Sequence, residues 1–222
     1  MTMTMTIETV SAGTPRLVRW KGRDVLTSIF KTPVAGPVRV RRHNLEGDRQ
    51  SDLAVHGGEF KAVYAYAVED YGWWREALGH DLETANFGEN LTVRGLSGSE
   101  VHVGDIFRAG AAELEATEPR LPCHKLGIRF GDPRMVKAFA DARRWGVYFR
   151  VVTEGPLSAG DPFERIHADP AAIPVSDVAR VFLFDRGDSA TIERLAAHER
   201  LDPAWRDHFV ERLEGASARE ER

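Results

Sequence analysis

The chain has 222 residues, 42% of them hydrophobic, which is enough to bury one full core and a small second domain. Its 34 acidic and 30 basic residues give a formal net charge of -4 without a long basic block, which argues against a generic nucleic-acid or membrane-surface binder. One cysteine cannot form an internal disulfide, and no apolar run reaches the length of about 18 residues that a membrane-spanning helix needs. Residues 1–15 lack the features of a secretion signal, so we expect a cytoplasmic protein with a flexible N-terminus.

The N-terminal half has the pattern of short strands. Residues 16–44 contain β-branched runs separated by the turn sequences KGR and PVAGP, which is typical of strands joined by hairpins. Residues 61–79 first alternate like a strand and then place Tyr71, Trp74 and Leu78 on one helical face. This half therefore predicts a sheet with one helix.

The second half continues the sheet and then becomes helical. Residues 90–120 form a strand pattern broken by closely spaced glycine turns, which suggests a barrel or a rolled sheet. Residues 133–144 predict a helix, and residues 146–155 predict a strand. Beyond a proline-bearing junction the pattern predicts three amphipathic helices, at 176–185, 189–200 and 203–214.

We therefore expect an α+β fold, with a β-rich, barrel-like domain at residues 16–167 and a small three-helix unit at residues 175–222. The apolar faces of the helices predict that this unit has a core of its own, so that the barrel should fold without it.

The segment EPRLPCHKLG holds the single cysteine, Cys123. A lone cysteine is commonly a small buried hydrophobic residue. Here, however, two prolines stiffen the loop, and Arg120, His124 and Lys125 could favour the thiolate if they lie close to the sulfur. A thiolate is either a nucleophile or a soft metal ligand.

Two other interpretations of this cysteine remain open. Cys123 and His124 could form a nucleophile pair, although adjacent residues on a strand point to opposite faces. Zinc could be bound by Cys123, His56 and His124, although their spacing matches no structural zinc pattern.

Two further segments have the composition of a ligand site. His56 followed by Gly57 and Gly58 puts an imidazole beside an accessible backbone, and Lys61 adds a positive charge, which together suit an anion. A tight turn with a solvated lysine would have the same composition. The sequence GEN ends at Asn90, whose amide could recognise the edge of a heterocycle, but GEN is also an ordinary turn.

Four segments in series resemble the MOSC domain, a module related to the C-terminal domain of molybdenum cofactor sulfurases, and in particular its stand-alone YiiM-like branch. They are LEGDRQSDLAVHGG (45–58), FGENLTVRGL (87–96), VHVGDIFRAG (101–110) and EPRLPCHKLGIRFGD (118–132). The likeness covers residues 16–167 and extends to the helical tail, which resembles the three-helix appendage of that branch.

This resemblance implies a barrel-like fold that binds the molybdenum cofactor, in which a pterin carrying a phosphate holds molybdenum through dithiolene sulfurs; pyridoxal phosphate is not expected. Cys123 occupies the position of the family's molybdenum ligand, as suits a soft thiolate. The matching positions for further cofactor contacts are His56, Gly57, Gly58, Lys61, Asn90, Arg120 and Lys125. Of these, Lys125 could instead be an exposed lysine that contacts no ligand.

The resemblance also implies an enzyme that reduces N-hydroxylated compounds, such as N-hydroxylated purines, hydroxylamines and amidoximes, because molybdenum can accept oxygen from an N–OH group and be re-reduced by two electrons. One cysteine cannot hold a Cys₄ iron–sulfur cluster, and the chain has no G-x-G-x-x-G fingerprint, so a separate flavin or iron–sulfur reductase is implied as electron donor. The alternative is a non-catalytic carrier or sensor of the cofactor or of sulfur.

Overall fold

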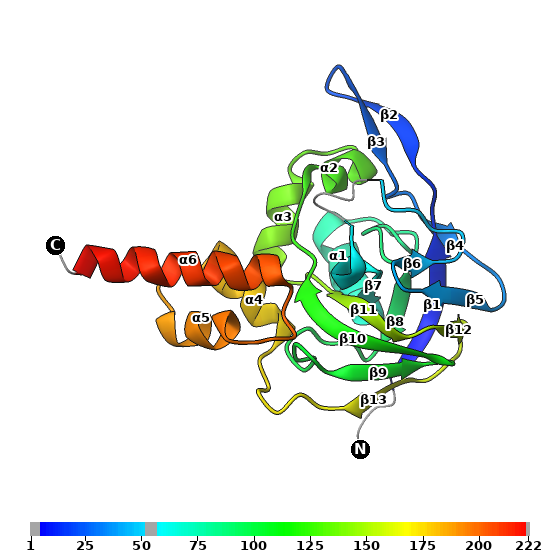
Figure 1. Cartoon of the computed structure of the whole chain (residues 1–222). Coiled ribbons are helices and arrows are strands. Elements are labelled where there is room, and N and C mark those ends of the chain that lie inside the picture. The colour runs from blue at the N-terminus through cyan, green and yellow to red at the C-terminus, as the bar shows by residue number, and fades with distance from the viewer. Residues whose placement is uncertain (1–4, 52–56, 221–222) are drawn as a thin grey trace.

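The computed structural model describes residues 5–51 and 57–220, with the backbone alone for residues 217–220 (Figure 1). Its largest element is a sheet of eight strands. These strands are β1 (Thr6–Ala12), β4 (Thr32–Pro33), β7 (Val63–Ala67), β8 (Leu91–Arg94), β9 (Ile106–Ala109), β10 (Ala112–Pro119), β11 (Val147–Thr153) and β13 (Phe163–His167).

Two smaller sheets flank the large one. A three-stranded sheet consists of β5 (Val38–Arg41), β6 (Asn44–Leu45) and β12 (Gly155–Leu157). The hairpin of β2 (Arg16–Trp20) and β3 (Arg23–Thr27) projects from the body of the molecule (Figure 1).

Helices lie around this framework (Figure 1). A short 3₁₀ helix, η1, spans Glu59–Lys61. The α-helices are α1 (Val68–Leu78), α2 (His124–Phe130), α3 (Met135–Ala142), α4 (Val175–Leu183), α5 (Ser189–Ala196) and α6 (Pro203–Glu220). None of the helices in the part of the chain that the structure describes is long and apolar enough to cross a membrane.

The large sheet is rolled but not closed. Its order is β13-β9-β10-β11-β7-β8-β1-β4, and all neighbours are antiparallel except β7 and β8, which α1 connects. An isolated bridge between Thr6 and Pro162 brings β1 toward β13, and the N–H of Phe163 donates to the carbonyl of Met5 at 2.9 Å. This confirms the expected barrel-like α+β fold.

Strand β7 shows how one sequence pattern fills both faces of the sheet. Val63, Ala65 and Ala67 belong to the main core, whereas the alternate residues Tyr64 and Tyr66 pack in a second cluster with side chains of α1, α2 and α3. Side chains alternate along a strand, so a strand covered on both faces must be apolar at every position. Helices α1 to α3 therefore cover the outer face of β7.

The N-terminal prediction was wrong for residues 6–12. These residues form β1, which pairs with β8, and Ile7 and Val10 are buried in the main core. Their alternation of threonine with apolar residues is a strand pattern.

The prediction of a separate core for the tail was also wrong. The three helices are present, but Val178, Leu195 and Phe209, one from each of α4, α5 and α6, belong to the same apolar cluster as the barrel interior. Backbone hydrogen bonds join the two parts as well, because the N–H of Val103 donates to Ile173 and the N–H of Val175 donates to Val101, both at 2.9 Å. The tail therefore completes the barrel's core.

Candidate functional site

Two pockets meet at Cys123. The inner pocket has a volume of about 80 Å³, and the outer pocket has a volume of about 650 Å³, within the usual range of small-molecule sites. Lys61, Arg120, Cys123 and Tyr148 line both. Further residues of the inner pocket include Ser28, Lys31, Asp48, Arg49, Asn90 and Lys125, and those of the outer pocket include Glu118, His124, Asp202, Trp205 and His208.

The thiol lies beside a buried guanidinium. Cys123 is partly exposed and stands in extended conformation directly before α2, and Nη2 of Arg120 lies 3.7 Å from its Sγ. Arg120 is only 5% exposed; it donates to the carbonyl of Leu121 at 3.2 Å and lies 5.1 Å from the ring centroid of Phe139. A fixed positive charge next to the sulfur stabilises the thiolate over the thiol.

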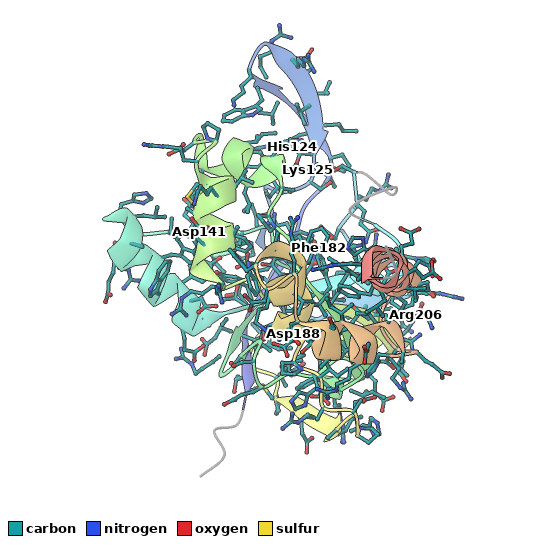
Figure 2. All side chains as sticks on the ribbon, turned by 90° about the vertical axis from the view of Figure 1, so that its left-hand side faces the viewer. His124, Lys125, Asp141, Phe182, Asp188 and Arg206 are labelled. Atoms are coloured by element: carbon teal, nitrogen blue, oxygen red, sulfur yellow. The ribbon has the colours of Figure 1, made fainter. Side chains whose placement is uncertain are left out.

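The first two residues of α2 differ in exposure, because one side chain lies in solvent and the other lines a pocket. His124 is exposed and, of these two pockets, belongs to the described lining of the outer one, whereas Lys125 is 7% exposed and lines the inner pocket beside Cys123. Figure 2 shows both side chains at the start of α2. The alternative of an exposed lysine at position 125 is therefore wrong, because α2 begins at His124 and directs the next residue inward.

Asn90 is held by the protein itself. Its Nδ2 donates to the carbonyl of Ser11 at 3.2 Å and to Oδ2 of Asp48 at 3.0 Å, and its Oδ1 accepts from the N–H of Tyr64 at 3.1 Å. Lys31 forms a 2.5 Å ion pair with the same Asp48 oxygen. The amide donors of Asn90 therefore hold the wall of the inner pocket in place, and contact with a ligand stays a prediction.

Lys61 connects the barrel to the helical tail. It ends η1, and its Nζ lies 3.3 Å from Oε1 of Glu118 on β10 and 3.8 Å from Oδ2 of Asp202, just before α6. Burial raises the pKa of Glu118 to about 7; Lys61 opposes this shift and Asp202 adds to it. The anion contact predicted for Lys61 would therefore compete with two carboxylates.

The HGG segment is placed only in part. His56 lies outside the described residues, and neither Gly57 nor Gly58 belongs to the described lining of the two pockets. The N–H of Gly58 donates to Oε1 of Gln50 at 3.2 Å, and its φ of 95° favours glycine. This N–H is therefore engaged within the protein.

Several wall residues were missed by the sequence analysis. Asp48 lies within the motif LEGDRQ and Glu118 opens the cysteine loop, so local signals for both were present. Tyr148 and Trp205 reach the site only through strand pairing and the docking of α6. As for the zinc alternative, no group of three histidine, cysteine or acidic side chains suited to a metal ion occurs among the described residues.

Comparison with known proteins places this chain in a family. Residues 52–164 match the model of the MOSC domain. The chain belongs to the MOSC family. Residues 173–216 match the model of the YiiM-like 3-alpha helix domain, so the tail has the identity that its sequence predicted. MOSC domains are associated with molybdenum cofactor binding, which makes this a protein related to that cofactor.

Relatives extend over most of the chain. YflK from Bacillus subtilis is 37% identical over 91% of this chain and 92% of the relative, and YiiM from Escherichia coli is 31% identical over 81% of each. A protein named Reductase from Gibberella moniliformis is 32% identical over 72% of this chain, but this alignment spans 29% of the fungal protein. The crystal structure of YiiM from Geobacillus stearothermophilus has a TM-score of 0.80 at 32% identity and covers 94% of this chain and 99% of that chain.

Proposed function

We propose that this MOSC protein is a molybdenum cofactor-dependent reductase of N-hydroxylated compounds, with Cys123 as the protein ligand to molybdenum. The observation that carries the proposal is a thiol beside a buried guanidinium at the junction of two pockets. The family association with the cofactor and the relative named Reductase support an oxidoreductase. The substrate class follows from the YiiM-like resemblance of the sequence.

The donor set of the inner pocket fits the cofactor. A soft thiolate suits molybdenum, and the positive charge of Arg120, Lys125 and Arg49 suits oxo and phosphate groups. Oγ of Ser28 is buried in this wall with no hydrogen-bond partner among the described residues, so it can bind a ligand. The chemistry of these side chains suits the cofactor, whereas the volume of the inner pocket, about 80 Å³, is smaller than that of a pterin.

The outer pocket suits the substrate. When bound, the molybdenum cofactor supplies the two electrons that break the N–O bond. Trp205 on α6 offers an aromatic face to a planar amidoxime or purine, and His208 and Asp202 offer polar contacts to its edge. The guanidinium of Arg120 lies 3.7 Å from the sulfur of Cys123, and a positive charge at this place favours binding of a metal by the thiolate. Electrons reach the site from a separate flavin or iron–sulfur reductase.

Turnover of an aromatic amidoxime with a chemical reductant tests this function. Protein from a host that makes the molybdenum cofactor should form the amidine, and protein from a host that lacks the cofactor should not. Bound cofactor without turnover of amidoximes, hydroxylamines or N-hydroxylated purines would contradict the reductase and indicate a carrier or a sensor.

A further inference from the structure

One carboxyl group of the outer pocket, that of Glu118, is buried and pairs with Lys61 through one of its two oxygens. Glu118 is the next-to-last residue of β10, opposite Tyr148 of β11, and its side chain is 3% exposed. It lines the outer pocket together with Cys123. A titratable group is thus placed in the same cavity as the proposed metal ligand.

The two oxygens of Glu118 are treated differently by the fold. Oε1 faces Nζ of Lys61 at 3.3 Å, whereas Oε2 is buried without a hydrogen-bond partner among the described residues. On the same strand, Glu115 has both oxygens engaged, by Arg150 at 3.0 Å and by Arg200 at 2.7 Å. Burying a carboxyl oxygen without a partner is costly, so a catalytic role, a ligand or an ordered water is needed to explain such an atom.

We propose that Glu118 is the catalytic proton donor for N–O cleavage, delivering its proton to the substrate nitrogen from which oxygen departs. This inference rests on the proposed reductase function. It assigns a proton-transfer role to a residue of this chain, separate from cofactor binding.

The reaction requires such a donor. Reduction of a hydroxylamine follows R–NHOH + 2 e⁻ + 2 H⁺ → R–NH₂ + H₂O: the N–O bond breaks, nitrogen gains an electron pair, and the external reductase is oxidised by two electrons. One proton goes to nitrogen and one to oxygen, which leaves as water. An amide anion is far more basic than hydroxide, so nitrogen has the greater need of an acid. Glu118 supplies that proton, solvent supplies the other, and Lys61 then stabilises the carboxylate.

The surroundings of Glu118 suit an acid that works at neutral pH. Burial raises its pKa to about 7, Lys61 lowers it, and Asp202 raises it further. Tyr148 stays neutral at pH 7, because burial raises its pKa above its usual range. The other titratable groups in the described lining of this pocket are Arg120, Cys123, His124 and His208. The protonated form is lost above neutral pH, so the rate should fall as the pH rises through about 7.

The test compares Glu118→Gln with Glu115→Gln, both as holoproteins, using an aromatic amidoxime and a chemical reductant. Glutamine keeps the shape but cannot give up a proton, so Glu118→Gln should lower kcat roughly a hundredfold or more with unchanged molybdenum content. Glu115→Gln removes a buried carboxylate from the same strand without touching either pocket, and it should retain kcat.

The pH profile and a titration separate catalysis from structure. In Asp202→Asn, the new side chain can still cap α6, but the acidic neighbour of Glu118 is lost. The falling limb of the pH–rate profile should therefore move to lower pH.

In the wild type, infrared difference spectra should show a protonated carboxyl that titrates near pH 7 and is missing in Glu118→Gln. Wild-type turnover with equal kcat and pH profile in Glu118→Gln would overturn the role of Glu118 alone. No wild-type turnover would overturn the reductase function and this inference with it.

Discussion

Arg120 precedes Cys123 in the chain and Lys125 follows it, and both are buried and line the inner pocket. There their positive charges can contact anionic groups of a bound cofactor. We therefore predict that Arg120→Ala and Lys125→Ala both lower the pterin content of purified protein. A charge-assisted contact contributes about 1.5–3 kcal/mol, so each loss should weaken binding roughly ten- to a hundredfold.

Arg134→Ala is the matched control for these two variants, because the Arg134 side chain is 89% exposed and pairs with Asp132 in the loop before α3. It should keep the wild-type pterin content. Wild-type content in Arg120→Ala or Lys125→Ala would show that the anion site lies elsewhere.

Glu118 also makes stability depend on pH. Its pKa rises from 4.5 to about 7 on folding, so the folded state holds the proton more tightly than the unfolded state. The resulting stabilisation is complete below about pH 4 and is lost as the pH rises through 7. At about 1.4 kcal/mol for each pH unit, the free energy of unfolding of the wild type should fall by roughly 3 kcal/mol relative to that of Glu118→Gln as the pH rises from about 4 to about 7. Thermal unfolding at pH 5 and at pH 8 measures this; a constant difference between the proteins would contradict the raised pKa.

The sequence could identify the residues whose chemistry is local. The cysteine loop held Arg120, Cys123 and Lys125, and the structure brings all three to one pocket wall. The burial of Lys125 was not predictable, because it depends on where α2 begins. The role of Asn90 was not predictable either, because its amide is held by Asp48, which is 42 residues away in the chain.

Most elements follow from sequence periodicity. The expected helices at 133–144 and 189–200 correspond to α3 (Met135–Ala142) and α5 (Ser189–Ala196), and the expected strand at 146–155 contains β11. Helix α2 was not predicted as an element, because a helix of seven residues is too short to show a recognisable helical periodicity in the sequence. Strand β1 was missed because a repeat at the chain end obscured its alternation.

Helices α4 to α6 should not be removable, in contrast to the expectation from sequence. Their buried side chains share one cluster with the barrel, and Arg200 forms a 2.7 Å ion pair with Glu115 of β10. We predict that a chain ending before Val175 aggregates or binds 8-anilinonaphthalene-1-sulfonate strongly, because it exposes the core that these helices cover.

Point variants test the same claim without truncation. Leu195→Ala removes a fully buried side chain of α5 and should cost about 2–5 kcal/mol in the unfolding of the whole chain. Val210→Ala, at a position of α6 that is 41% exposed, should cost much less. A soluble truncated barrel with native near-ultraviolet circular dichroism would contradict the shared core.

At the scale of the whole molecule, the tail is part of the site. Residues Asp202, Trp205 and His208 of the tail face β10 and the cysteine loop across the outer pocket, and Lys61 lies between the two parts. Sequence predicted the helices of the tail but not this position, because periodicity gives the apolar face of a helix and not its partner. Substrate entry is therefore shaped jointly by the barrel and the tail.

The central claim is that Cys123 binds molybdenum through its thiolate. Metal analysis of wild type and Cys123→Ser, purified side by side from a host that makes the molybdenum cofactor, tests it most directly. Serine changes the volume little but replaces a soft ligand by a hard one. The account predicts molybdenum in the wild type and loss of most of it in Cys123→Ser. When both proteins are purified from a host that lacks the cofactor, their Tm values should be equal. Equal molybdenum per protein in both would contradict it.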